Sequence, residues 1–144
     1  MKIDIDYISR LLNVFLEAQT SHISILDFPK ADIPIETEDE LVNEEFLFHI
    51  QIALENGLMS DRDMKIDGLK TIGLHLMGNG GLTIAIKPIR LTQKGHDFAL
   101  ALQNKEVLTR LKTELKNAPF KTLFDGSQKL LEHFLTKKLD KLLE

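Results

Sequence analysis

Two extended apolar runs in the middle of the chain, joined by a glycine-rich loop, limit the fold more than any other feature. The runs cover residues 69–76 and 82–91, and the Met77–Gly81 loop between them contains an Asn-Gly pair. Asn-Gly favours the positive φ angles of a type I′ hairpin turn, although a loop of this composition also fits a longer tip. The apolar side of the second run shifts at Pro88, which indicates a bulge or an edge position there. The sequence therefore predicts an antiparallel hairpin.

Helical patterns precede and follow this hairpin. Apolar residues spaced three and four apart predict an amphipathic helix over residues 4–20, and the Ile23–Phe28 segment predicts a short strand. Thr37 lies three residues before Glu40, as in a capping box, so one long helix, or two short ones fused, is expected over residues 36–56. Three further helices are expected to begin at capping side chains, namely Thr92, Asn104 and Ser127.

The order of these elements is that of a winged-helix domain: helix, short strand, long helix ending in Asn-Gly-Leu, hairpin, then helix. The Phe48–Leu58 and Ile89–Phe98 segments resemble the bacterial and prophage domain-of-unknown-function 2513 family. The first eight residues and the Leu/Lys-rich last helix resemble that family's ends. The most specific part is Arg90-Leu91-Thr92 followed by Gly95-His96 and Phe98. The resemblance implies a winged-helix-like fold and no established activity.

We therefore expect an α+β, mostly helical protein. A winged-helix-like domain over residues 1–103 would carry a two- or three-stranded antiparallel wing, and residues 104–144 would form a C-terminal helical extension. Gly95 lies in the first turn of a helix, where glycine is unfavourable, so we expect it to pack closely against the hairpin backbone. His49 and His96 are expected to make structural hydrogen bonds, and would form a polar latch between helix and wing if they are close together.

Charge is distributed unevenly along the chain. Residues 1–60 carry twelve carboxylates against three Lys or Arg, whereas residues 61–144 carry fifteen Lys or Arg against ten carboxylates. The net charge of -4 excludes a uniformly basic coat for nucleic acid. Two explanations fit this asymmetry: one basic face for an anionic partner, or an attraction that holds the two halves together.

The leading functional hypothesis is a DNA-binding transcriptional regulator of bacterial or prophage origin. Docking of a recognition helix in the usual way is disfavoured, because residues 36–56 hold seven carboxylates and no Lys or Arg. Contact with double-stranded DNA would instead use basic residues of and beside the wing that position the protein on phosphates, namely Lys65, Lys70, Lys87, Arg90 and Lys94.

The alternative hypothesis is a protein–protein interaction adaptor or inhibitor. It would bind a basic partner through the acidic helix over residues 36–56, at Glu40, Glu44 and Glu45. A homodimer is expected in the first hypothesis through a leucine stripe in the last helix, at Leu131, Leu135, Leu139 and Leu142. Packing of this stripe on its own domain is the competing interpretation, and a membrane contact is disfavoured because the chain has no Trp anchor.

Residue types argue against several other classes of function. The chain contains no Cys, which excludes disulfides, thiolate zinc sites and cysteine nucleophiles, and no segment has the length of a membrane span, so we expect a cytoplasmic protein. The five histidines lack the spacing of metal ligands. The glycine run at 78–81 lacks the Lys-Ser/Thr of a phosphate-binding loop. We expect no enzymatic activity, no metal and no other cofactor.

Overall fold

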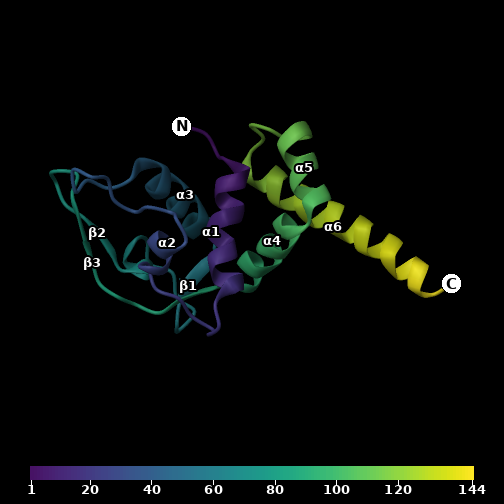
Figure 1. Ribbon diagram of the computed structural model, residues 1–144, viewed down its shortest axis with the longest axis horizontal. Helices are drawn as coiled ribbons and strands as arrows, with labels where there is room; N and C mark the ends of the chain where they lie inside the picture. Colours follow the sequence, from purple (N-terminus) through teal and green to yellow (C-terminus); the bar gives the residue numbers. More distant parts are fainter.

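Helix α1 (Ile5–Glu17) crosses the middle of the molecule in the computed structural model, which describes residues 1–144 (Figure 1). The Asp4 side chain caps α1 by accepting a hydrogen bond from the Tyr7 N–H. On one side of α1 lie α2 (Asp27–Lys30), α3 (Glu44–Glu55) and all the strands. The helix predicted over residues 4–20 is thus confirmed, with an end three residues earlier than expected.

The three remaining helices lie on the other side of α1. They are α4 (Gln93–Gln103), α5 (Lys105–Glu114) and α6 (Phe120–Leu142). Helix α4 packs against both α1 and α6, and α5 packs against all three. The fold is therefore α+β and mostly helical, as the sequence predicts, and the second half of α6 projects from the body (Figure 1).

Two separate antiparallel pairs make up the sheet structure. Strand β1 (Met59–Asp61) pairs with β4 (Ile89–Leu91), and β2 (Leu74–Leu76) pairs with β3 (Leu82–Ile84). A single bridge joins Ile23 to Ile89 in the antiparallel sense, so β4 lies between β1 and the chain at Ile23. We call residues 62–88, which connect β1 to β4 and include β2 and β3, the hairpin segment.

One hydrophobic core connects the two predicted parts of the chain. It contains 27 buried apolar residues, among them Leu11 of α1, Phe46 of α3, Phe98 of α4 and Leu111 of α5. Phe98 also meets the α6 rings of Phe120 and Phe124 at 5.5 Å between centroids. Helix α5 and the first half of α6 therefore pack on the preceding residues and share their core.

The hairpin segment differs from the sequence prediction. Residues 69–76 and 82–91 are not continuous strands, since residues 70–72 form a 3₁₀ turn, η1 (Lys70–Ile72), and β3 ends at Ile84. Pro88 is neither the predicted bulge nor an edge position, because β3 ends at Ile84 and β4 begins only after Pro88. The type I′ turn is wrong: it requires two positive φ angles, and in this loop only Gly80 has one, at 86°. The loop is the longer tip that the same composition allows.

The start of α3 also corrects the prediction of a helix over residues 36–56. Thr37 does not cap a helix; its backbone N–H donates to the Leu41 carbonyl oxygen at 2.7 Å and closes a turn. Glu40 has a φ of 61° in this turn, a left-handed conformation that cannot continue an α-helix. The helix begins only after Asn43, whose side chain accepts a hydrogen bond from the Phe46 N–H.

Long-range pairing explains why residues 36–43 are not helical. Glu36 bridges to Val42, and the Val42 N–H donates to the Gly80 carbonyl oxygen at 3.0 Å. A further bridge joins Leu41 to Gly81. The tip of the hairpin segment therefore takes up backbone groups that a helix would otherwise satisfy internally.

Two other predicted boundaries are wrong for local reasons. Only Ile23 of the expected Ile23–Phe28 strand pairs with another strand, because the Asp27 carboxylate accepts the Ser24 N–H and turns the chain into α2. Ser127 does not begin the last helix, since α6 already starts at Phe120 and the Ser127 hydroxyl donates to the Phe124 carbonyl oxygen inside it.

The remaining caps are as predicted, and Gly95 packs closely on backbone as expected, although on Leu58 and not on the hairpin. The Thr92 hydroxyl accepts the Gly95 N–H at 3.0 Å and caps α4, and the Asn104 side chain caps α5. A Cβ atom on Gly95 would lie 1.9 Å from the Leu58 carbonyl oxygen, so only glycine allows α4 to approach the chain just before β1 this closely. Gly57, with a φ of 67°, ends α3 as expected.

Candidate functional site

The hairpin segment carries four exposed cations, Arg62, Lys65, Lys70 and Lys87. None of them takes part in any of the three ion pairs of the molecule. Lys70 and Lys87 lie together, because the Lys87 ammonium donates to the Lys70 carbonyl oxygen at 3.1 Å. Their positive charges are therefore available to a partner and are not neutralised by the acidic half of the chain.

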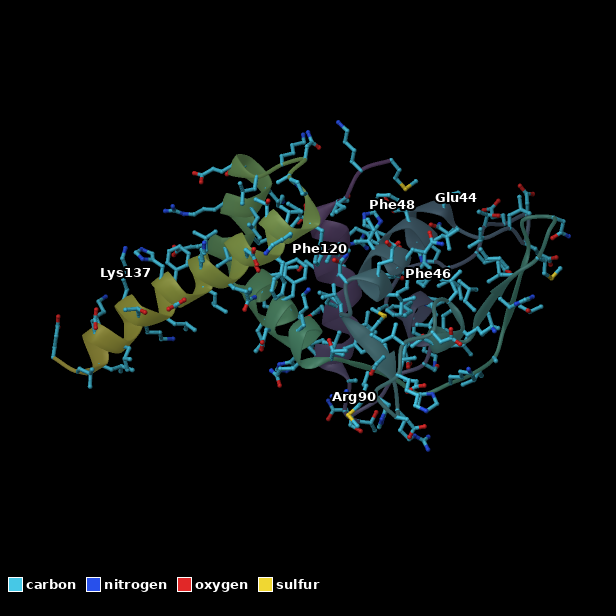
Figure 2. All side chains as sticks on the ribbon, turned by 180° about the vertical axis from the view of Figure 1, so that it is seen from behind. Glu44, Phe46, Phe48, Arg90, Phe120 and Lys137 are labelled. Carbon is cyan, nitrogen blue, oxygen red and sulfur yellow. The ribbon has the colours of Figure 1, made fainter.

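Two of the five predicted DNA-binding residues lie elsewhere. Arg90 is half-buried in β4, opposite Ser60, and Figure 2 shows it at the periphery of the molecule. The Lys94 ammonium lies over two aromatic rings of α6, 5.8 Å from the Phe120 centroid and 4.9 Å from the Phe124 centroid. The structure thus places the predicted set in the hairpin segment (Lys65, Lys70 and Lys87), in β4 and on α4, and not in one cluster.

The carboxylates predicted to form an acidic helix lie partly in the turn before α3 and partly on α3 itself. We call the seven exposed carboxylates the acidic surface: Glu36, Glu38, Asp39, Glu40, Glu44, Glu45 and Glu55. None of them forms an ion pair. The turn that carries the first four is held by its bridges to the tip of the hairpin segment. Negative charge therefore surrounds that tip as well as α3.

The inner face of α3 is anchored by His49. This side chain is 1% exposed, its Nε2 accepts the Asp4 N–H at 2.9 Å, and its Nδ1 lies 2.7 Å from the Glu45 carbonyl oxygen. The predicted structural role of His49 is confirmed. The predicted latch with His96 is wrong, because both ring nitrogens of His49 already have partners on α1 and α3, whereas His96 is exposed on α4.

Tyr7 packs on the His49 ring with the two centroids 4.4 Å apart. Its hydroxyl group is buried without a hydrogen-bond partner. Burial raises the pKa of Tyr7 to about 12, the Glu45 carboxylate adds to this shift and Arg10 opposes it. The Tyr7–His49 contact therefore joins α1 to α3 through an uncharged phenol.

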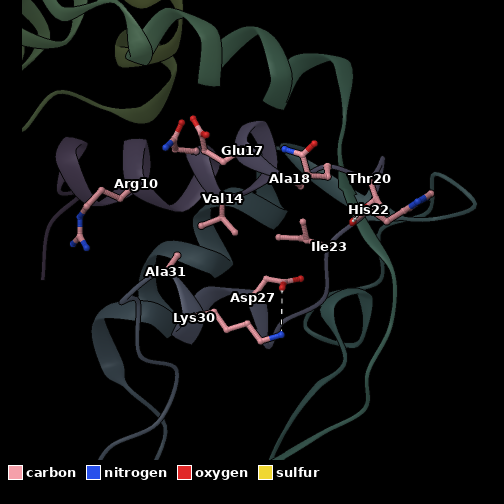
Figure 3. Close-up of a pocket in the computed structure, with 12 residues that line it drawn as sticks. Arg10, Val14, Glu17, Ala18, Thr20, His22, Ile23, Asp27, Lys30 and Ala31 are labelled. Carbon is pink, nitrogen blue, oxygen red and sulfur yellow. Dashed lines mark hydrogen bonds and ion pairs between the residues drawn. The ribbon is translucent and has the colours of Figure 1, made fainter.

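A groove of about 430 Å³ lies between α1 and α2 (Figure 3). Its charged side chains have both signs: Arg10 and Lys30 against Glu17 and Asp27. Lys30 lies 3.9 Å from the Asp27 carboxylate, which also accepts the Ser24 N–H. The groove was not predicted, because its residues come from three segments that share no sequence pattern. Its opposed charges partly satisfy one another and favour no particular ligand.

The leucine stripe of α6 is divided between the body and solvent. Leu131 packs against the core, whereas Leu135, Leu139 and Leu142 are 53%, 54% and 76% exposed. These three lie on the part of α6 that projects from the body, where Figure 2 labels Lys137. Self-packing therefore accounts for the first residue of the stripe and leaves the other three without a partner in the monomer.

The chain holds no group of three or more His, Asp or Glu side chains placed to bind a metal ion. None of its helices combines the length and the apolar character that a membrane-spanning helix requires. Comparison of the chain with protein-family models, with curated proteins and with solved structures found no match. The functional argument therefore rests on the geometry and charge described above.

Proposed function

We propose that the protein is a non-enzymatic winged-helix module that binds the backbone of double-stranded DNA through its hairpin segment, as a regulator of transcription. The order α1, Ile23, α2, α3, β1, hairpin segment and β4 supports the winged-helix assignment. The central position of β4, between Ile23 and β1, is consistent with the same topology. In this assignment the hairpin segment is the wing and α3 takes the place of the recognition helix.

One observation carries the proposal: the cations of the hairpin segment are exposed and free of ion pairs. Ammonium and guanidinium groups in this state gain counterion release when they meet phosphates. Lys70 and Lys87 are neighbours in the fold, because the Lys87 ammonium donates to the Lys70 backbone carbonyl oxygen. Each would position the protein on the duplex without reading its sequence.

The acidic surface sets the orientation of this contact. Glu44 and Glu55 lie at the two ends of α3 and are exposed, so α3 would bring carboxylates toward phosphates if it entered the major groove. The tip of the hairpin segment is bordered by the acidic turn and is disfavoured for the same reason. Contact would be made by the base of the hairpin segment, near η1.

We test this function by measuring the affinity for random duplex DNA at low and at physiological salt. Replacement of Lys70 and Lys87 by Gln is expected to weaken binding about tenfold at low salt and to reduce the salt dependence, because two phosphate contacts are lost. Lys137→Gln with Lys141→Gln is the matched control, since it removes the same charge from the projecting half of α6. Equal loss in both pairs, or no binding at low salt, would contradict the proposal.

The proposed module is a homodimer through the exposed half of α6. Leu135, Leu139 and Leu142 lie on one face of the helix, and Glu132 and Lys138 lie on opposite flanks of that face at 100° per residue. A second copy that presents the same face would cover these exposed leucines.

Light scattering coupled to size exclusion tests the dimer. Leu135→Ser with Leu139→Ser is expected to give a monomer that keeps its fold, because both side chains are already exposed in the monomer. Asp140→Ser, on the opposite face of α6, is the control and is expected to leave the mass unchanged. A monomeric wild-type protein at high concentration would overturn this part of the proposal.

A second candidate function is an adaptor for a basic protein partner. The observation that favours it is the acidic surface, whose turn is held by pairing to the hairpin tip and whose carboxylates have no partners in the molecule. Glu40, Glu44 and Glu45 would then carry the contact. Binding of a polylysine peptide that is lost in Glu40→Gln, Glu44→Gln and Glu45→Gln, in a protein that does not bind DNA, would favour this function over the first.

A further inference from the structure

A second cleft lies where the end of α1 meets β4 and the first turn of α4. Its volume is about 320 Å³. The residues that line it are Phe15, Leu16, Thr20, Ser21, Ile23, Arg90, Leu91 and His96. The bridge between Ile23 and Ile89 brings these segments together, although they are more than sixty residues apart in the sequence.

The electrostatic character of this cleft is one-sided. Arg90 and His96 are its only titratable residues, and it contains no carboxylate. The three other principal cavities that have charged linings all include carboxylates: Glu17 and Asp27, Asp4 and Asp6, or Glu55. Among these cavities, this cleft is therefore the one in which no negative charge on the wall would repel a bound anion.

The two basic side chains of the cleft have no other task in the fold. The Arg90 guanidinium forms neither an ion pair nor a side-chain hydrogen bond, and the same holds for the His96 ring. By contrast, Lys112 pairs with Asp6 at 2.8 Å and Lys94 lies over the α6 rings. The donors of Arg90 and His96 are thus free to bind a ligand.

The remaining lining residues define the kind of anion. Phe15, Leu16, Ile23 and Leu91 give the cleft an apolar wall. The planar fork of Arg90 matches two oxygens of a phosphate group. Leu91 and His96 flank the start of α4, whose positive end adds to the attraction.

We propose that the Arg90–His96 cleft is a binding site for a phosphate group. Arg90 binds two of its oxygens, His96 donates to a third, and the apolar wall packs against the carbon atoms that carry the phosphate. The phosphate belongs either to the DNA backbone or to a phosphorylated small molecule. The first source rests on the proposed DNA-binding function, whereas the second does not.

The test is a titration of the full chain, whether monomer or dimer, with inorganic phosphate at constant ionic strength. Backbone amide NMR spectra are recorded at each phosphate concentration. We expect saturable shifts confined to residues 15–23 and 90–96. Arg90→Gln and His96→Gln are each expected to raise the Kd for phosphate at least tenfold, and Arg90→Lys to give an intermediate value because the charge remains and the fork is lost. Arg110→Gln, an exposed arginine on α5 that lies outside both the cleft and the hairpin segment, is the matched control.

A parallel titration with a short duplex DNA separates the two sources. If Arg90→Gln weakens phosphate and duplex alike, the DNA backbone supplies the phosphate group. If it weakens only phosphate, a small phosphorylated ligand is the source, and phosphate binding without any DNA binding would refute the proposed function while leaving the cleft in place. Absence of saturable phosphate shifts, or equal binding by wild type, Arg90→Gln and His96→Gln with unchanged thermal melting, would overturn the inference.

Discussion

Helix α3 and the hairpin segment are separated in the chain by little more than the short strand β1, and their exposed surfaces carry charges of opposite sign. The inner side of α3 buries Phe46, His49 and Ile50 in the core, and its outer side is acidic. The hairpin segment buries little beyond Thr71, Ile72 and Leu74, and its exposed charges are mainly basic. The position of a helix in the topology therefore does not by itself decide what it can bind. The charge on its outer face also decides which partner can approach it.

Replacement of Phe46, which packs α3 into the core, should have the largest effect on stability. Phe46 is fully buried and meets Phe28 edge-on at 5.5 Å between ring centroids. Phe46→Ala is expected to lower the free energy of unfolding by about 3–5 kcal/mol, as large-to-small substitutions of core aromatics do. Urea denaturation checks this value. Phe48 is only half-buried, so Phe48→Ala should lower the free energy of unfolding clearly less. Equal losses in the two variants would show that α3 does not pack on the core through the side that carries Phe46.

A substitution in the hairpin segment should separate its folding from that of α3. Gly73 has a φ of 81°, and a Cβ atom there would lie 1.8 Å from the Ala85 carbonyl oxygen. Gly73→Ala is expected to cost about 2–3 kcal/mol through backbone strain and loss of β2–β3 pairing. Hydrogen exchange should show lost protection at residues 74–84 and retained protection in α3. Gly78→Ala, in open space at the loop, is the control.

The Tyr7 contact with α3 predicts a loss of stability at high pH. Because the pKa of Tyr7 is raised from 10.0 to about 12 in the folded protein, the unfolded chain loses the phenol proton first. The associated stability is complete below about pH 10 and is lost as the pH rises through about 12, by roughly 2 kcal/mol.

Two measurements isolate this effect. Tyr7 is the only tyrosine and the chain has no tryptophan, so the ultraviolet absorbance of phenolate follows this residue alone. Tyr7→Phe should remove the extra pH dependence of unfolding while the lysines still titrate. A phenolate transition at pH 10 in the folded protein would refute the buried Tyr7–His49 packing.

The smallest effect is expected on the outer face of α3. Glu44→Gln with Glu45→Gln should raise the affinity for duplex DNA about two- to threefold at low salt, because two repulsive charges are removed at a distance from the bound phosphates. Glu106→Gln with Glu114→Gln, on α5, is the control. Weaker DNA binding by the α3 variant would show that these side chains contact the DNA. That result would contradict the assignment of the contact to the hairpin segment.

Local signals in the sequence predicted several boundaries correctly. Thr92 and Asn104 cap their helices with side chains only two or three residues from the amides they bind, so no distant contact can override them. Gly57 ends α3 for the same local reason. The cap expected at Thr37 was wrong because Val42 and Leu41 pair with the hairpin tip some forty residues away.

The candidate sites depended even more on long-range contacts. The sequence identified Lys70, Lys87 and Arg90, yet only the fold shows that the first two lie together and that the third lies in a cleft with His96. Lys94 was assigned to the same surface, although Phe120 and Phe124 of α6 pack beneath its ammonium group. Residue type indicated which side chains carry a suitable charge, and only tertiary packing shows which of them lie close to one another.

The most direct test of the difference between α3 and the hairpin segment is to map the DNA contact by backbone amide NMR with a short duplex. The account predicts shifts at Arg62, Lys65, Lys70 and Lys87 and their neighbours, which diminish as salt is added. It predicts no shifts on the outer face of α3, from Glu44 to Glu55. Shifts concentrated on α3, with none in the hairpin segment, would contradict it.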